Sequence, residues 1–119
     1  DIVTTDLSFI SVLKVLPAVK EFLDGGRLLS LIKPQFEVGK GQVGKKGVVR
    51  NPALHEDVLD RIIEEAHKMG FALRRLIKSS HRGQKGNREF FIFWSLEEES
   101  LGQGEVQRLI KEAVWNEKN

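Results

Sequence analysis

The 119-residue chain contains no cysteine and no long apolar run. The first absence excludes a disulfide framework and a thiolate metal site, and it suits a reducing compartment. The second excludes a membrane-spanning helix, which needs roughly 20 apolar residues in succession. The opening residues, Asp1-Ile2-Val3, also lack the features of a signal peptide. We therefore expect a soluble, cytoplasmic protein with no membrane partner.

Methionine is missing from the first position, and a strand-like run begins at once. We therefore expect this chain to be part of a longer protein. Its composition, 40% hydrophobic and 30% charged, provides for one modest core and a single domain.

An excess of charge of one sign is also missing, because the net charge is only +2 at pH 7. The basic residues are nevertheless unevenly spread. Between Lys33 and Arg50 the only acid is Glu37, and from Arg74 to Arg88 there is none. Two basic loops that contain glycine are typical of a surface that binds a phosphate backbone. On charge alone, solvated loops without such a role explain the pattern equally well.

The first part of the chain predicts a strand, a helix and a second strand. Residues 2–5 are β-branched, and residues 27–32 are mostly apolar. Between them, residues 8–23 repeat apolar side chains near the helical period. We expect the regular helix to begin near Leu16, because Pro17 is unfavourable inside a longer one. This spacing indicates a βαβ unit with two parallel strands.

The rest of the chain predicts further elements after a flexible basic loop at about 34–54, which is rich in glycine and lysine. A helix is expected over 55–69, then strands at 71–77 and 89–94, and a last helix after Gly104. No helix separates the two strands, so the second should return antiparallel. Its unbroken run of aromatic residues is typical of a strand buried on both faces. The pattern as a whole indicates an α/β fold.

Three charged residues are predicted to meet at one edge of this sheet. Asp6 and Lys33 follow the two parallel strands, and Glu89 begins the antiparallel one. Ligands of open α/β sheets bind outside the carboxyl ends of the parallel strands. Each residue alone reads more simply as a surface charge at a strand end. Their coincidence at one edge favours a site.

Four blocks of sequence resemble one known family. They are Asp6-Leu7-Ser8-Phe9-Ile10-Ser11, Leu31-Ile32-Lys33-Pro34-Gln35-Phe36-Glu37 with Val38-Gly39-Lys40, Pro52-Ala53-Leu54-His55, and Lys85-Gly86-Asn87-Arg88-Glu89-Phe90-Phe91. Together these blocks resemble the catalytic half of the FtsJ-type ribosomal RNA methyltransferases, and in particular the hemolysin-like TlyA branch. The resemblance implies a Rossmann-like methyltransferase fold, with residues 1–119 forming a single partial domain, the C-terminal half.

The family's reaction is transfer of a methyl group from S-adenosylmethionine to a ribose 2′-hydroxyl, with a Lys-Asp-Lys-Glu tetrad. The resemblance implies that Asp6, Lys33 and Glu89 match the last three members and that Asp6 lies at the edge of the cofactor pocket. The first lysine and the main cofactor loop have no counterpart in this chain. The implied partner is ribosomal RNA or a ribosomal subunit.

The chemistry of this reaction explains the residue types. A ribose hydroxyl is a poor nucleophile that needs positioning and a base. A lysine acts as a base only when neutral, and nearby carboxylates favour its charged form. The hypothesis is that Lys33 activates the hydroxyl, while Asp6 and Glu89 orient it and stabilise charge.

The long basic loop also fits a second motif. Residues Gly39 to Lys45 satisfy Gly-x-x-x-x-Gly-Lys, the phosphate-binding loop of nucleotide hydrolases. Lys46 stands where that motif needs Ser or Thr, so we favour contact with RNA phosphates. The residues expected to make it are Lys40, Lys45, Lys46, Arg50, Arg82 and Lys85.

The remaining candidates indicate structural roles or stay open. His55 is expected to cap or pack, and no metal site is expected because no His, Asp or Glu residues show paired ligand spacing. Trp115 would either cover the sheet or contact another copy in a homo-oligomer. The alternative to an enzyme is a non-enzymatic RNA-binding module or a hemolysin-like protein.

Overall fold

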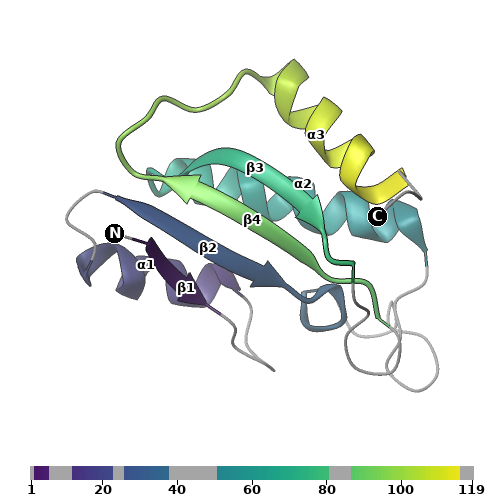
Figure 1. The fold of residues 1–119 in the computed structure, drawn as a ribbon, viewed down its shortest axis with the longest axis horizontal. Coiled ribbons are helices and arrows are strands. Elements are labelled where there is room, and N and C mark those ends of the chain that lie inside the picture. Colours follow the sequence, from purple (N-terminus) through teal and green to yellow (C-terminus); the bar gives the residue numbers. More distant parts are fainter. Residues whose placement is uncertain (1, 6–11, 23–25, 38–50, 81–86, 116–119) are drawn as a thin grey trace.

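The computed structural model describes residues 2–5, 12–22, 26–37, 51–80 and 87–115 (Figure 1). The elements in chain order are β1 (Ile2–Thr5), α1 (Val12–Phe22), β2 (Arg27–Ile32), the short 3-10 helix η1 (Pro34–Phe36), α2 (Pro52–Lys68), β3 (Ala72–Lys78), β4 (Phe90–Ser95) and α3 (Gln103–Trp115). The order of strands and helices in the described residues follows the sequence pattern.

The strands form a four-stranded sheet in the order β1-β2-β4-β3. β1 and β2 are parallel, and β4 lies antiparallel between β2 and β3. The predicted parallel pair and the antiparallel return are both confirmed. As a consequence, β1, β2 and β3 all end at the edge of the sheet where β4 begins (Figure 1).

Helix α1 begins earlier than expected. The prediction of a regular helix starting near Leu16 is wrong, because α1 starts at Val12 and contains Pro17. Leu16 is fully buried in the core, whereas Pro17 is exposed. Burying a leucine contributes about 1.5–3 kcal/mol, which offsets much of the roughly 3 kcal/mol that an internal proline costs.

Helix α2 also begins earlier, at Pro52 rather than near His55. The Asn51 side chain accepts a hydrogen bond from the Ala53 N–H at 2.9 Å and caps the helix. Proline directly after such a cap is favourable, because its missing N–H would have no helical partner there. With η1 at one end and α2 at the other, both ends of the predicted loop 34–54 are ordered. Its residues 38–50 lie outside the described ranges.

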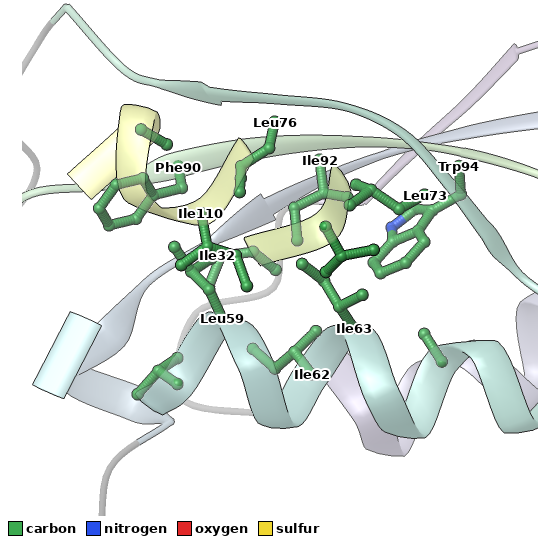
Figure 2. Close-up of a cluster of buried hydrophobic side chains, with 14 of the residues drawn as sticks. Ile32, Leu59, Ile62, Ile63, Leu73, Leu76, Phe90, Ile92, Trp94 and Ile110 are labelled. Carbon is green, nitrogen blue, oxygen red and sulfur yellow. The ribbon is translucent and has the colours of Figure 1, made fainter. Parts of the chain in front are cut away.

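The core lies on one face of the sheet. Figure 2 shows side chains of β2, β3 and β4 packed against α2 and α3. The labelled residues are Ile32, Leu59, Ile62, Ile63, Leu73, Leu76, Phe90, Ile92, Trp94 and Ile110. Inside this core, the indole N–H of Trp94 on β4 donates to the Ser30 hydroxyl on β2 at 3.0 Å. This hydrogen bond ties the two central strands together.

The opposite face of β4 is only partly covered. Phe91 and Phe93 are half-buried, so the expectation of a strand buried on both faces is wrong for these two residues. The guanidinium of Arg75 on β3 lies 5.6 Å from the centre of the Phe93 ring. Alternate burial along β4 therefore sets one face against the helices and leaves the other partly open.

Trp115, which the sequence left undecided, joins α3 to α2. Its indole N–H donates to the Glu56 carboxylate, which also pairs with the Lys111 ammonium at 3.1 Å. The Trp115 side chain otherwise remains exposed.

Candidate functional site at the carboxyl edge of the sheet

The candidate site is built on the end of the β2–β4 ladder. Ile32, the last residue of β2, pairs with Phe90, the first residue of β4. One further step along this register sets Lys33 opposite Glu89. The backbone of Lys33 is still extended, with φ −114° and ψ 98°. Directly opposed residues of an antiparallel pair point to the same face of a sheet. The side chains of Lys33 and Glu89 are therefore expected on the same face.

β1 ends at the same edge as β2, because the two strands are parallel and Thr5 pairs with Ser30. Asp6 follows directly but lies outside the described residues. The register thus places Lys33 and Glu89 at the same edge of the sheet, where β1 also ends with Thr5. The predicted RNA-contacting residues, Lys40, Lys45, Lys46, Arg50, Arg82 and Lys85, also lie outside the described ranges.

The turn that follows Lys33 is tethered to α2. The Glu37 N–H donates to the Pro34 carbonyl at 2.9 Å and closes η1. The Glu37 side chain is only 3% exposed, and its Oε1 lies 3.7 Å from the Arg61 guanidinium on α2. Arg61 also donates to the Glu37 carbonyl oxygen. The segment that carries Lys33 is therefore fixed at both ends, by β2 on one side and by Arg61 on the other.

Sequence reasoning missed a set of buried polar residues at this edge. Lys78, the last residue of β3, is 6% exposed, and Asn87, shortly before β4, is 2% exposed. The Ser79 N–H donates to the Glu89 carbonyl at 2.8 Å. β3 ends in Leu76-Ile77-Lys78, as β2 ends in Leu31-Ile32 and is followed by Lys33, and that repeated Leu-Ile-Lys pattern was the available signal. Glu89 begins the strand that runs between these two lysine-ended strands.

His55 packs beneath this edge, as expected for a packing residue. It is buried, and its ring meets the Phe90 ring edge-on, with 5.6 Å between centroids. In the ranges that the structure describes, no three His, Asp or Glu side chains gather in a way that would hold a metal ion. Among the same residues, no helix is both long enough and apolar enough to cross a membrane.

A cavity of about 510 Å³ lies at the other end of the sheet, between the end of α2 and the start of α3. It is lined by Asp60, Ile63, Glu64, His67, Lys68, Gln103 and Val106. The Nε2 atom of His67 accepts a hydrogen bond from the Leu73 N–H at 3.2 Å, just where β3 begins. The neutral ring therefore carries its proton on Nδ1. Partial burial lowers the pKa of His67.

Comparisons with known proteins identify relatives across most of the chain. A family model described as FtsJ-like methyltransferase matches residues 1–96. The Bacillus subtilis protein YqxC is 40% identical over 116 residues, which is 92% of this chain and 41% of YqxC. The 16S/23S rRNA (cytidine-2′-O)-methyltransferase TlyA of Mycobacterium tuberculosis is 40% identical over 94 residues, 78% of this chain and 35% of TlyA. This chain thus spans well under half the length of these relatives.

Two solved structures are also similar to this chain. A structure of a hemolysin-named protein from Lactococcus lactis superposes with a TM-score of 0.83 at 32% identity. It covers 93% of this chain, and the match is 54% of the Lactococcus chain. A second hemolysin-named protein, from Streptococcus thermophilus, has a TM-score of 0.82 at 33% identity and covers 94% of this chain and 42% of its own.

The half-buried His67 should make the folded state sensitive to mild acid. Because its folded pKa lies below the unfolded value of about 6.5, the unfolded chain binds the proton more readily. Protonation of Nε2 also removes the acceptor for the Leu73 N–H. We expect the free energy of unfolding to fall as the pH drops through about 6.5, measured by urea denaturation between pH 8 and pH 5.

The control for this prediction is His67→Gln, whose side chain does not titrate. The variant should show a flatter dependence of stability on pH over the same range. An equally steep dependence in the variant would assign the effect to other groups.

Proposed function

The chain belongs to the FtsJ-like methyltransferase family, and from this membership we propose that it forms the C-terminal, catalytic half of a ribosomal RNA 2′-O-methyltransferase domain. The observation that supports the proposal is the register of β2 against β4, which ends with Ile32 opposite Phe90 and would bring the next residues, Lys33 and Glu89, side by side at the carboxyl edge of the sheet. The names of the Mycobacterium tuberculosis and Campylobacter jejuni relatives specify a cytidine 2′-oxygen. We extend that substrate, a cytidine ribose in ribosomal RNA, to this chain.

Lys33 and Glu89 would act on the ribose hydroxyl. Lys33 contacts the 2′-oxygen and takes its proton as the oxygen attacks, and Glu89 holds the ammonium that results. Asp6 orients the hydroxyl from the end of β1. The tether between Glu37 and Arg61 keeps Lys33 from shifting, and an error of about 1 Å in position can reduce a rate by roughly 100-fold.

The cofactor expected for this family is S-adenosylmethionine, which supplies the methyl group as an electrophile. The described residues at the carboxyl edge include a lysine, a glutamate and buried polar groups. They are suited to contact with the target nucleotide of the RNA rather than with the cofactor. The cavity between α2 and α3 is at the opposite end of the sheet and does not fit a cofactor beside Lys33. We therefore assign cofactor binding mainly to the half of the domain that precedes this chain, with Asp6 at the edge of the pocket.

Calorimetry with S-adenosylmethionine tests this division of the domain. We expect no binding by the 119-residue chain. The extended protein is this chain with the upstream half of Bacillus subtilis YqxC joined in front of it. We expect the extended protein to bind S-adenosylmethionine. The upstream half alone, tested in parallel, shows whether this chain contributes. If neither the 119-residue chain nor the extended protein binds S-adenosylmethionine, a non-enzymatic RNA-binding module is favoured instead.

Lys33→Ala in the extended protein should lower methyl transfer to ribosomal RNA by about 100-fold or more, the usual contribution of an acid or base group. Transfer is measured with radiolabelled S-adenosylmethionine, and calorimetry should find cofactor affinity unchanged. The matched control is Lys14→Ala, which removes an exposed lysine from α1. Undiminished transfer by Lys33→Ala would remove Lys33 from the chemistry.

The basic loops are proposed to bind RNA phosphates. Replacement of Lys40, Lys45, Lys46, Arg50, Arg82 and Lys85 by glutamine should make log K less dependent on log salt concentration. Each lost phosphate contact changes the slope by about 0.7–0.9. Binding is measured on a ribosomal RNA fragment from 50 to 200 mM salt. Glutamine at the exposed helix lysines Lys14, Lys68 and Lys111 serves as control. A slope that stays the same in the loop variant counts against the proposal.

A further inference from the structure

One face of the sheet carries apolar side chains that remain half-buried. Leu31 on β2 pairs with Phe91 on β4, which pairs in turn with Ile77 on β3. Directly opposed residues of antiparallel strands point to the same face, so these three side chains form one row across the sheet. A second row, two residues further along, contains Leu29 and Phe93. All five residues are half-buried, and we call them the open face.

The helices lie on the opposite face. Leu16 of α1, Ile62 of α2 and Ile110 of α3 all belong to the same core cluster. The strand residues in that cluster, such as Ile32 and Ile92, alternate with those of the open face. Figure 2 shows α2 and α3 packed on that side, and within the described part of the chain no α-helix covers the open face. Parallel strands joined through helices belong to α/β sheets, which bury both faces, so the open face requires a second layer.

The edge of the sheet at β1 also requires a partner. Among the described strands β1 pairs only with β2, so its other edge presents unpaired backbone groups. The sequence of β1 contains neither proline nor a charged side chain, which are common means of protecting a free edge. Such an edge accepts a further strand. It adjoins the open face, because β1 lies beside β2, the strand that carries Leu29 and Leu31.

We propose that the open face and the free edge of β1 bind the upstream half of the methyltransferase domain, tightly enough to hold the two halves together without a covalent link. This inference rests on the proposed function, which makes this chain one half of a domain. The matched stretch is only 41% of YqxC and 35% of TlyA. Both relatives therefore contain enough chain to supply a strand beyond β1 and an apolar layer over the open face.

The position of the open face links this docking to the candidate site. Leu31 and Phe91 lie two residues from Lys33 and Glu89 in the same strand register. Residues two apart in a strand share a face, so Lys33 and Glu89 are expected beside the open face. A layer bound there would reach the edge where the family resemblance requires another lysine and the main cofactor loop. Docking of the upstream half would thus also complete the site.

RNA is a competing occupant, because exposed aromatic rings can stack on bases. The composition of the open face favours a protein layer instead. Leu29, Leu31 and Ile77 are aliphatic and provide no ring for stacking. The Phe93 ring also has the Arg75 guanidinium 5.6 Å from its centre, which leaves less room for a base.

Cleavage between the two halves tests the docking directly. A protease site placed before Asp1 in the extended protein allows the halves to be cut apart after the domain has folded. We expect the two pieces to elute together in gel filtration. Replacing both Phe91 and Phe93 by threonine should separate them, because two rings leave the interface while β-branched residues remain in β4. The matched control is Trp115→Thr, which removes an exposed ring from α3 and should leave the pieces together.

Melting temperatures distinguish loss of docking from loss of folding. The double threonine variant should lower the Tm of the uncleaved extended protein by about 4–8 °C more than it lowers the Tm of the 119-residue chain, because only the extended protein covers the two rings. An equal loss in both proteins would show that the rings stabilise only this chain's own fold, and would overturn the proposal.

The remaining outcomes identify other occupants of the open face. Pieces of the parent that separate after cleavage would overturn the inference, and so would pieces of the double variant that stay together. If the parent pieces separate, a dimer of the 119-residue chain that the double variant breaks would assign the open face to a second copy. Loss of binding to a ribosomal RNA fragment in the double variant would assign it to RNA. Pieces that stay together but transfer no methyl group would contradict the proposed function and leave the docking intact.

Discussion

The register of β2 against β4 is the constraint on which the site depends. It sets Ile32 against Phe90 and, one step further, Lys33 beside Glu89. A slip of one residue would send every side chain of β2 to the opposite face of the sheet. The buried alternation along both strands opposes such a slip, and so does the hydrogen bond from Trp94 to Ser30. The packing of the core thus determines which charges meet at the edge.

The edge of the sheet combines rigidity with buried polarity. Lys78 and Asn87 lie there with little exposure, and the turn after Lys33 is tied to α2 through Glu37 and Arg61. The side-chain amide of Gln35, which has no hydrogen-bond partner among the described residues, belongs to the same turn. Placing polar groups out of water is unfavourable for folding but useful in a site, where preorganised groups act most strongly in a dry environment. The large apolar core under the sheet offsets this local disadvantage.

Much of this arrangement could be predicted from the sequence, because it follows from local patterns. Apolar runs located the strands, and the absence of a helix before Phe90 indicated the antiparallel return, which sets Glu89 at the same edge of the sheet as Lys33. Contacts between distant residues could not be read in this way. The pairing of Glu37 with Arg61 does not follow from local sequence, and the repeated Leu-Ile-Lys pattern marks the place of Lys78 but not its burial. The start of α1 was predicted wrongly for the same reason. Only the packing of Leu16 in the core shows why the helix tolerates Pro17.

The family assignment and the geometry support one central proposal, that the edge at Lys33 takes part in methylation of a ribose rather than a base. The most direct measurement is mass spectrometry of nucleosides from ribosomal RNA treated with the extended protein and isotopically labelled S-adenosylmethionine. The account predicts that the label appears on the sugar, as a 2′-O-methylated cytidine. Label on the base of any nucleoside, with none on a ribose, would contradict it.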